Sequence, residues 1–229
     1  MPKVSLIVTC VDMLELTKKC VELIKQHTPP VYELIIVCDR PSKEMTEWLV
    51  KDEEILKFHE NPDPVGTPVA RNIGIKMAEG EYIGFVDNDV SVTEGWFTPL
   101  LETLKAKPHY GWVASKMMRG DLVMNFGVVS ATLFTREAIN KVGLFDERFS
   151  QGVGWEDNDY LLRFWRAGYF PHGVAKSVVY HPPEPMTLKM LHGEKKQERF
   201  FANLKLFNEK WGVEAADAFE FWTKVPVEE

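Results

Sequence analysis

The chain contains little of what marks several large classes of protein. Its 229 residues include only three cysteines, Cys10, Cys20 and Cys38, and their odd number and spacing fit neither a disulfide framework nor a zinc motif. We therefore expect buried thiols in a reduced, cytoplasmic protein. No apolar run is long enough to cross a bilayer, and the first run, residues 4–9, is too short for a signal peptide. Positive charge is also scarce, and the net charge of −7 argues against nucleic acid as a main partner.

The rest of the composition is that of a globular protein, with 45% hydrophobic and 27% charged residues. We find no internal repeat, low-complexity segment or clear linker, so residues 1–229 are expected to form a single domain. The acidic balance has a chemical consequence. A substrate that carries phosphate groups would need a local cation, either a metal ion or a cluster of Arg and Lys.

Predicted strands alternate with predicted helices in the first half of the chain. Apolar runs predict strands at about 3–9, 32–38, 55–58 and 82–86. The spacing of apolar residues predicts helices at about 13–26, 43–50 and 68–78, the last two with Ser42 and Thr67 as N-caps. This order predicts an α/β protein with a parallel sheet and right-handed crossovers.

The second half of the chain has a less regular pattern. It predicts helices at about 95–106, 136–141, 157–167 and 193–211. It predicts strands at about 112–115, 128–134 and 176–180, and a glycine-containing loop at 149–154.

Two aspartates stand one residue apart after the apolar run 81–86. Asp87 and Asp89 would project carboxylates from the C-terminal end of a buried strand, where open α/β sheets bind ligands. Neighbouring carboxylates repel each other and stay ionised most readily around a divalent cation. The alternative is a solvated acidic turn, because Asp and Asn are common turn residues.

Other polar residues lie at the ends of predicted elements. Asp39 follows the second strand, where it could bind a ligand or act as a turn acid before Pro41. Glu156 and Asp157 open a helix, a place where acids are common as caps worth about 1 kcal/mol. His181 ends a strand, and a lone histidine is more often structural than a ligand.

Taken in order, several short motifs resemble those of glycosyltransferases of the GT-A fold, in the large and mostly inverting family two. The motifs are V-S-L-I-V-T at 4–9, V-C-D at 37–39, A-R-N-I-G at 70–74, G-E-Y-I-G-F-V-D-N-D at 80–89, G-L-F-D-E at 143–147, W-E-D-N-D-Y at 155–160 with Arg163, and His181. The resemblance covers about residues 3–182. It implies a mostly parallel, Rossmann-like central sheet flanked by helices, a small mixed sheet on the acceptor side and a C-terminal helix. It also implies a donor half at 1–90, an acceptor and catalytic half at 91–182, and a helical tail at 183–229.

The resemblance further implies a nucleoside-diphosphate sugar as donor, with a UDP-sugar most common. Donor-binding roles would fall to Thr9, Val11, Asp39, Arg71, Asp87 and Asn88. Metal-binding roles would fall to Asp89, Asp87 and His181, which suit Mn²⁺ or Mg²⁺. The ion would neutralise the departing nucleoside diphosphate. The base-contacting turn departs from the family, which more often has Asp-Gly-Ser where this chain has D-R-P-S at 39–42.

On the acceptor side, the resemblance implies that Asp157 is a general base. It would deprotonate a hydroxyl of a glycan or glycolipid acceptor, an effect worth about 10²–10⁴-fold, and direct displacement would invert the anomeric carbon. Glu156 would support Asp157 or bind the acceptor, and Trp155 would offer an apolar platform to a sugar face. We expect acceptor specificity to lie in the irregular stretch at about 107–154.

Some of these residues have structural alternatives. Arg71 could be a surface residue paired with Glu79 or Asp63. Asn72 and Gly74 of the same motif are expected to serve helix packing.

Asp159 and Arg163 are spaced so that they could form an ion pair on one face of their helix.

The C-terminal tail contains a locally basic segment. The segment after His181 could be a lid over a pyrophosphate, a face that meets an acidic acceptor or, in peripheral membrane contact, anionic lipid, or a solvated helix face. Its basic residues are Lys189, Lys195, Lys196 and Arg199.

Two other functions fit the same fold. A sugar nucleotidyltransferase would carry a glycine-rich basic loop after the first strand, but this chain has C-V-D-M at 10–13, without glycine. A non-catalytic sugar- or nucleotide-binding module would bind without turnover. The presence of Asp87, Asp89 and Asp157 favours the enzyme over the module.

Overall fold

The computed structural model describes residues 3–30, 32–53, 55–125, 129–152, 154–182, 195–212 and 225–228. Within these ranges, ten strands form one sheet in the order β10-β9-β6-β8-β4-β1-β2-β3, with β5 paired to β9 and β7 paired to β6. The strands are β1 Val4–Val11, β2 Tyr32–Asp39, β3 Ile55–Asn61, β4 Tyr82–Asp87, β5 Ser91–Val92, β6 Trp112–Arg119, β7 Leu122–Met124, β8 Thr132–Thr135, β9 His172–Tyr180 and β10 Val227–Glu228. The helices are α1 Leu14–His27, α2 Lys43–Lys51, α3 Thr67–Met77, α4 Phe97–Ala106, α5 Arg136–Val142, α6 Glu156–Arg166 and α8 Lys196–Trp211, with short 3₁₀ helices η1 Pro108–Tyr110 and η2 Glu147–Gln151.

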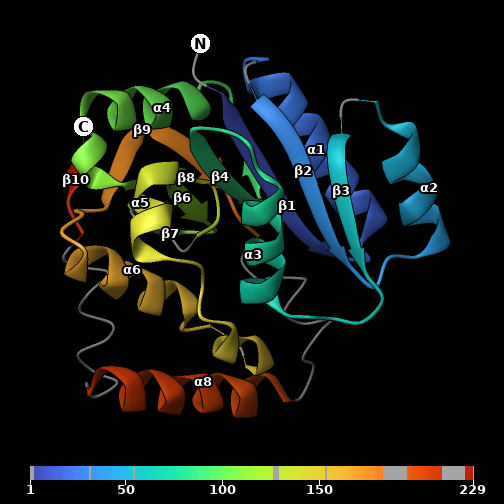
Figure 1. Ribbon diagram of the computed structural model, residues 1–229. Coiled ribbons are helices and arrows are strands. Elements are labelled where there is room, and N and C mark those ends of the chain that lie inside the picture. Colours follow the sequence, from blue (N-terminus) through green and yellow to red (C-terminus); the bar gives the residue numbers. More distant parts are fainter. Residues whose placement is uncertain are drawn as a thin grey trace.

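The first four strands are parallel, as predicted, and their order determines where a ligand can bind. β1 lies between β2 and β4, and β3 lies outside β2. The chain therefore runs outward through β2 and β3 and then returns through α3 to β4 on the other side of β1 (Figure 1). Such a reversal of strand order opens a crevice beyond the carboxyl ends of the strands.

The second half of the sheet is mixed. β8 runs antiparallel to both β4 and β6, β9 runs parallel to β6, and β7 forms a hairpin with β6. These strands extend the parallel half without a break, so the small mixed sheet expected on the acceptor side is continuous with the central sheet.

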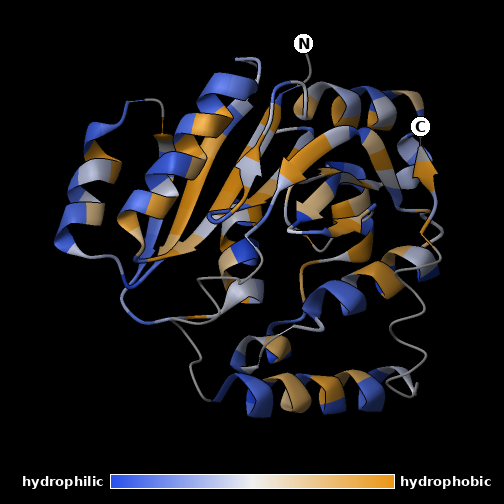
Figure 2. Ribbon diagram, turned by 180° about the vertical axis from the view of Figure 1, so that it is seen from behind, coloured by the Kyte–Doolittle hydropathy of each residue, from blue (hydrophilic) through white to orange (hydrophobic). Residues whose placement is uncertain are grey.

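Helices cover both faces of the sheet because alternate strand residues point to opposite sides. Leu6 and Val8 pack on one face with residues of α1, α2 and α4, whereas Ile7 packs on the other with residues of α3, α5 and α6. The strands are accordingly apolar along most of their length, while the outer helices have a polar face and an apolar face (Figure 2).

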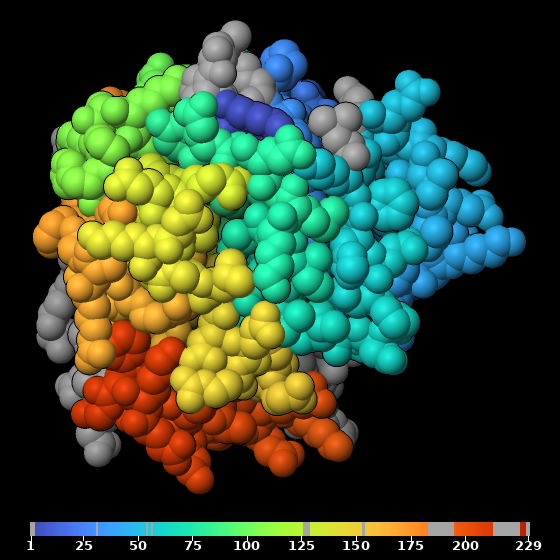
Figure 3. Space-filling model, in the orientation of Figure 1, coloured from blue at the N-terminus to red at the C-terminus, as the bar shows by residue number. Residues whose placement is uncertain are grey.

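The helix α8 lies outside these layers. It packs beneath α6 and the segment that precedes α6 (Figure 3). Phe207 of α8 is buried with Phe149, Trp155 and Leu162 in a small third cluster. The C-terminal helix therefore supports the region that contains the second acidic motif.

Most predicted elements are confirmed to within a few residues, and so is Ser42 as an N-cap, since its hydroxyl accepts a hydrogen bond from the Met45 N–H at 3.2 Å. The predicted Thr67 cap was wrong. Gly66 takes the N-cap position with a φ of +85°, and Thr67 is the first helical residue. The predicted loop at 149–154 begins instead as the 3₁₀ helix η2.

Two strands also differ from the expectation. β6 and β9 are longer than predicted because they pair with each other over most of their length. The predicted strand at 128–134 begins at Thr132, and residues 126–128 lie outside the described ranges. Among the helices that the structure describes, none has the length and apolar character needed to cross a membrane.

Candidate active site

The carboxyl ends of β1, β2 and β4 meet at one edge of the sheet. Strand pairing places Thr9 beside Asp87 and Val11 beside Asp39. A cavity of about 400 Å³ opens at this edge. Its walls come from β1, the end of β2, the segments after β2 and β3, α3, described residues between 149 and 154, the first residue of α6 and one residue of α8: Thr9, Cys10, Val11, Asp39, Arg40, Pro64, Gly66, Thr67, Pro68, Ala70, Phe149, Ser150, Gln151, Gly152, Gly154, Glu156 and Arg199. The fold thus brings three of the predicted donor-binding residues to one cavity.

The Asp39 carboxylate is held in place by donors from the segment after β3. Its Oδ1 accepts a hydrogen bond from Asn61 Nδ2 at 2.8 Å, and its Oδ2 accepts from the backbone N–H groups of Val65 and Gly66 at 3.0 and 3.4 Å. Burial raises the pKa of the Asp39 carboxyl, and these hydrogen bonds oppose that rise. Asp39 therefore presents a fixed acceptor group to the cavity.

The two aspartates after β4 belong to a tight turn. The turn is closed by a hydrogen bond from the Val90 N–H to the Asp87 carbonyl oxygen at 3.0 Å. Asp87 is half-buried and Asp89 is buried. Burial raises the pKa of the Asp87 carboxyl, Arg71 opposes the rise, and the neighbouring Asp89 adds to it. The two acids do form a turn, but Asp89 is buried and Asp87 is partly buried, which argues against the solvated turn considered from the sequence.

Asn88, between these two acids, contacts helix α1. Asn88 is 2% exposed, and its Nδ2 donates a hydrogen bond to Thr17 Oγ1 of α1 at 3.1 Å. Its side chain therefore fixes the turn against α1, and this placement does not support the predicted donor contact.

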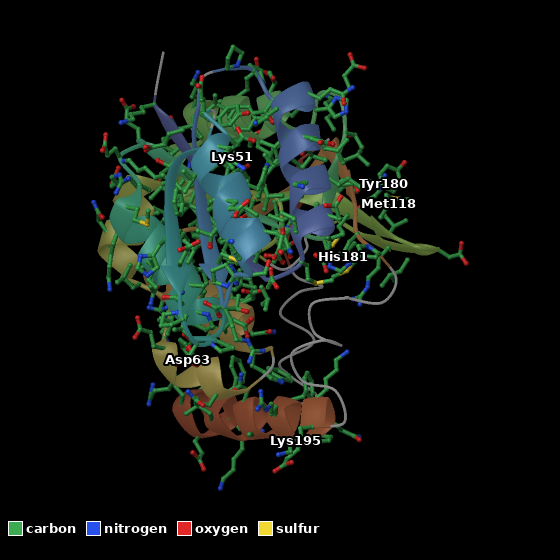
Figure 4. All side chains as sticks on the ribbon, turned by 90° about the vertical axis from the view of Figure 1, so that its right-hand side faces the viewer. Lys51, Asp63, Met118, Tyr180, His181 and Lys195 are labelled. Carbon is green, nitrogen blue, oxygen red and sulfur yellow. The ribbon has the colours of Figure 1, made fainter. Side chains whose placement is uncertain are left out.

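His181 lies next to Asp89, although the two residues are far apart in the sequence. The Nε2 atom of His181 is 3.5 Å from Asp89 Oδ1. A hydrogen bond to β6 fixes the position of His181: the His181 backbone N–H donates to the Met118 carbonyl oxygen at 2.9 Å. His181 and Met118 lie close together, near Tyr180 (Figure 4). Its Nδ1 is 2.7 Å from the Pro182 carbonyl oxygen.

These contacts fit a divalent cation. Because Nδ1 faces a carbonyl oxygen, it donates a ring proton there, and Nε2 is the nitrogen that faces the Asp89 carboxylate. In a neutral ring, Nε2 carries a lone pair that could share a cation with Asp89, whereas in a charged ring the Nε2–H group would pair with Asp89 directly. Among the described residues, no three His, Cys, Asp or Glu side chains are already arranged as a full metal site. Asp89 and His181 would therefore hold a divalent cation only together with further ligands.

The structure buries Arg71 instead of exposing it. Arg71 is 2% exposed, and its Nη1 donates to Asp157 Oδ1 at 2.6 Å while its Nη2 donates to the Val129 carbonyl oxygen at 2.8 Å. Nη2 also lies 3.5 Å from Asp87 Oδ1. These contacts replace the surface pairing with Glu79 or Asp63 that the sequence left open.

The two acids at the start of α6 have different environments. Asp157 is 6% exposed, and its Oδ2 accepts a hydrogen bond from the Val129 N–H at 3.0 Å, so it does not cap its own helix. Glu156 is half-buried on the cavity wall. Burial, followed by the charge of Asp157, raises the pKa of Glu156 from 4.5 to about 7.

The predicted sugar platform at Trp155 was wrong. Trp155 is 5% exposed, and its ring packs against Phe200 and Phe207 of α8 at centroid distances of 5.5 and 5.2 Å. Its backbone is left-handed, with a φ of +71°, which turns the chain into α6. Trp155 therefore anchors the start of α6 in the third apolar cluster and cannot present its face to a ligand.

The predicted packing roles are confirmed for Asn72 and Gly74. The Asn72 side chain exchanges two hydrogen bonds with the Phe145 backbone, at 2.9 and 3.0 Å. A Cβ on Gly74 would lie 2.5 Å from Ile7 Cγ2 of β1, so only glycine allows this approach of α3 to the sheet.

The predicted helix pair is confirmed as well. Arg163 Nε donates to Asp159 Oδ2 at 3.1 Å. Asp159 is completely buried and also binds Lys210 Nζ at 2.6 Å and Trp211 Nε1 at 2.9 Å, both from α8. The pair therefore also joins α6 to α8.

Two residues near the cavity, Arg40 and Asn203, were not identified from the sequence, and a third, Arg199, was named there only as part of the basic segment. Arg40 lines the cavity in a left-handed conformation with a φ of +49°, where glycine is favoured. The only sequence signal for this position was that Arg40 stands where an Asp-Gly-Ser type turn has glycine. Arg199 also lines the cavity, although its segment resembled a solvated helix face. Asn203 of α8 donates to the carbonyl oxygens of Phe149 and Gly154 at 2.9 and 2.7 Å, and nothing in the sequence indicated it. Of the other basic residues in the segment, Lys195 and Lys196 are exposed and Lys189 lies outside the described ranges.

The strand order defines an open α/β protein with a crevice at the carboxyl ends of its strands, and comparison with known families identifies which one. The model of glycosyl transferase family 2 matches residues 5–154. This match spans more than half of the chain, and the chain belongs to that family.

Curated relatives share part of their sequence with this chain. An uncharacterized glycosyltransferase, EpsJ of Bacillus subtilis, is 33% identical over 105 residues, which cover 44% of this chain and 30% of EpsJ. The GalNAc(5)-diNAcBac-PP-undecaprenol β-1,3-glucosyltransferase of Campylobacter jejuni is 29% identical over 117 residues, which cover 49% of this chain and 37% of that protein. The matched region is thus less than two fifths of either relative.

Solved structures confirm the fold. The mannosyltransferase PcManGT from Pyrobaculum calidifontis, in complex with GDP-Man and Mn²⁺, has a TM-score of 0.71 at 15% identity and aligns over 97% of this chain and 68% of its own. GalNAc-T7 with UDP, GalNAc and Mn²⁺ has a TM-score of 0.67 at 15% identity, over 98% and 56% of the two chains. The predicted GT-A fold is therefore confirmed.

Proposed function

We propose that this protein transfers a sugar from a nucleoside-diphosphate sugar to a hydroxyl group of a glycan or glycoconjugate, with a divalent metal ion and with inversion at the anomeric carbon. The observation that carries the proposal is that the Arg71 guanidinium lies between two acidic groups. Asp87, beside Asp89 and His181, lies on one side of Arg71, and Asp157 lies on the other. A transferase needs both a donor-holding site and a separate base, and this arrangement supports a proposal that assigns the two roles to these two groups.

The donor half of the site is proposed from the cavity. Asp39 would accept hydrogen bonds from the base or ribose, and Thr9 and Val11 would line the base pocket beside it. Asp87, Asp89 and His181 would hold Mn²⁺ or Mg²⁺. When bound, the ion would supply positive charge to the leaving diphosphate, which an acidic chain cannot do with its net charge.

The acceptor half is proposed from α6. Asp157 would take the proton of the acceptor hydroxyl as that oxygen attacks the anomeric carbon, and a single displacement of this kind inverts the configuration. Glu156, with a pKa near 7, is partly protonated at neutral pH and can donate a hydrogen bond from the cavity wall to a bound sugar.

Turnover of a donor panel tests the proposal. UDP- and GDP-sugars with Mn²⁺ should be consumed by the wild-type protein and should persist in the presence of chelator. Asp157→Asn should lower the rate about 10²–10⁴-fold while nucleotide binding, measured by calorimetry, is kept. Retention of the donor's configuration in the product, seen by NMR, would contradict inversion, and near-normal transfer by Asp157→Asn would contradict the assigned base.

The same panel separates a second candidate, a non-catalytic nucleotide-sugar module. One observation favours it: both oxygens of Asp157 already accept hydrogen bonds, from Arg71 and Val129. A carboxylate oxygen has more than one lone pair, so these bonds leave room for a proton. Binding of nucleotide sugars without turnover of any donor would favour the module.

A further inference from the structure

Arg71 is buried next to the candidate active site. Its guanidinium group contacts Asp157, the Val129 carbonyl oxygen and Asp87, at 2.6, 2.8 and 3.5 Å. With 2% of its surface exposed, it offers almost no area to a ligand. Its chemistry is therefore directed at other side chains.

Aromatic packing keeps the guanidinium in this position. The Arg71 Cζ atom lies 5.4 Å from the ring centre of Phe145 and 5.9 Å from that of Phe85. The next residue, Asn72, holds the Phe145 backbone with two hydrogen bonds. Arg71 would have to break this packing to reach into the cavity.

The contacts around Asp157 form a closed ring. Arg71 donates to Asp157 and to the Val129 carbonyl oxygen, and the Val129 N–H donates to the second oxygen of Asp157. The carboxylate thus accepts one hydrogen bond from the guanidinium and one from a backbone amide, one on each oxygen. The second arm of the guanidinium is held by the Val129 carbonyl oxygen, so the planar group fixes the orientation of the carboxylate.

We propose that Arg71 is a positioning residue for the chemical step: it orients the Asp157 carboxylate beside Asp87 and does not bind the donor. This inference rests on the proposed function. Its consequence is a separation of kinetic effects. Loss of the guanidinium fork should slow the chemical step, whereas the affinity for the donor nucleotide should stay the same.

The variant Arg71→Lys tests the fork while it keeps the charge. A lysine can make one of the two directed contacts but not both in a fixed plane. We expect kcat to fall on the order of 10²-fold, with the Kd for UDP or GDP in the presence of Mn²⁺ changed less than about threefold. The double variant Arg71→Lys/Asp157→Asn should be no slower than Asp157→Asn alone, because both changes remove the same effect.

Arg136→Lys is the matched control. Arg136 is another partly buried arginine whose guanidinium donates to two backbone carbonyls, of Ala78 and Gly80, away from the cavity. Its replacement should lower thermal stability and leave kcat unchanged. If Arg71→Lys does not fold, Phe145→Leu loosens the packing around the same guanidinium without a change of charge, and it should also lower kcat with nucleotide Kd kept.

The outcomes are distinguishable. A parallel rise in nucleotide Kd would make Arg71 a donor contact and overturn this inference alone. An unchanged kcat in a folded Arg71→Lys protein would reduce Arg71 to a structural residue and overturn it as well. A wild-type protein that turns over no donor would overturn the proposed function and this inference with it.

Discussion

At the scale of single residues, the pair Glu156–Asp157 shows how adjacent acids acquire different chemistry. Asp157 receives the Arg71 guanidinium and a backbone amide. Glu156 has no hydrogen bond from Arg71, and burial followed by the neighbouring Asp157 charge raises its pKa to about 7, although the Arg71 charge and a backbone amide oppose the rise. Environments that separate the protonation states of two acids are common in sites that use both forms.

The raised pKa of Glu156 predicts a pH-dependent stability. The pKa of Glu156 is higher in the folded state than in the unfolded chain, so between pH 4.5 and about 7 the unfolded chain loses this proton more readily. The contribution of Glu156 to the free energy of unfolding is therefore fully present below pH 4.5 and is lost as the pH rises through about 7. Glu156→Gln removes this loss, and should raise the free energy of unfolding at pH 8 relative to wild type by about 1–3 kcal/mol, measured by urea unfolding.

The comparison at acidic pH completes this test. At pH 4 both forms carry a neutral side chain, so Glu156→Gln and wild type should have nearly equal stability. Glu102→Gln, a change of an exposed acid on α4, should show no such difference between pH 4 and pH 8. A Glu156→Gln protein that is no more stable at pH 8 than wild type would contradict the raised pKa.

At the scale of elements, α8 is a support for the segment that forms one wall of the cavity. Asn203 is 3% exposed and binds the carbonyl oxygens of Phe149 and Gly154 through one amide nitrogen. A Cβ on Gly152 would lie 2.0 Å from the Asn203 side-chain oxygen, so the segment and the helix fit closely. The position of the wall therefore depends on a helix distant in sequence.

Asn203→Ala tests this support. The change leaves two carbonyl oxygens without their donor, and should destabilise the protein by about 1–3 kcal/mol. The looser wall should also weaken nucleotide binding, which calorimetry can measure alongside thermal unfolding. Gln197→Ala, at an exposed position of the same helix, should change neither quantity. Normal stability of Asn203→Ala would show that α8 rests on the domain without supporting the wall.

The sequence predicted what depends on local pattern. Strand ends are marked by the change from apolar to polar residues, so Asp39 and Asp87 could be placed at one edge before the structure was known. Contacts between distant side chains have no such mark. Arg71 and Asp157 are 86 residues apart, and only packing shows that one guanidinium joins them. Trp155 was misjudged for the same reason, because its cover comes from α8.

At the scale of the whole molecule, charge decides how an anionic donor can bind. The chain has a net charge of −7, and its cavity includes the acids Asp39 and Glu156 beside the cations Arg40 and Arg199. Asp87 and Asp89 add further negative charge next to the cavity edge. A nucleoside diphosphate would meet repulsion from these acids, so its binding should depend on a divalent ion.

Metal removal therefore provides the last prediction. With Mn²⁺, UDP or GDP should raise the melting temperature by mass action, and chelator should weaken nucleotide binding about tenfold or more, or 1.4 kcal/mol per factor of ten. His181→Ala should weaken Mn²⁺ binding because it removes the nitrogen that faces Asp89. His109→Ala, an exposed histidine in η1 just before the opposite end of β6, is the control and should bind Mn²⁺ normally. Nucleotide affinity that is unaffected by chelator would mean that Arg40 and Arg199 alone offset the acids, and the proposed metal site would be wrong.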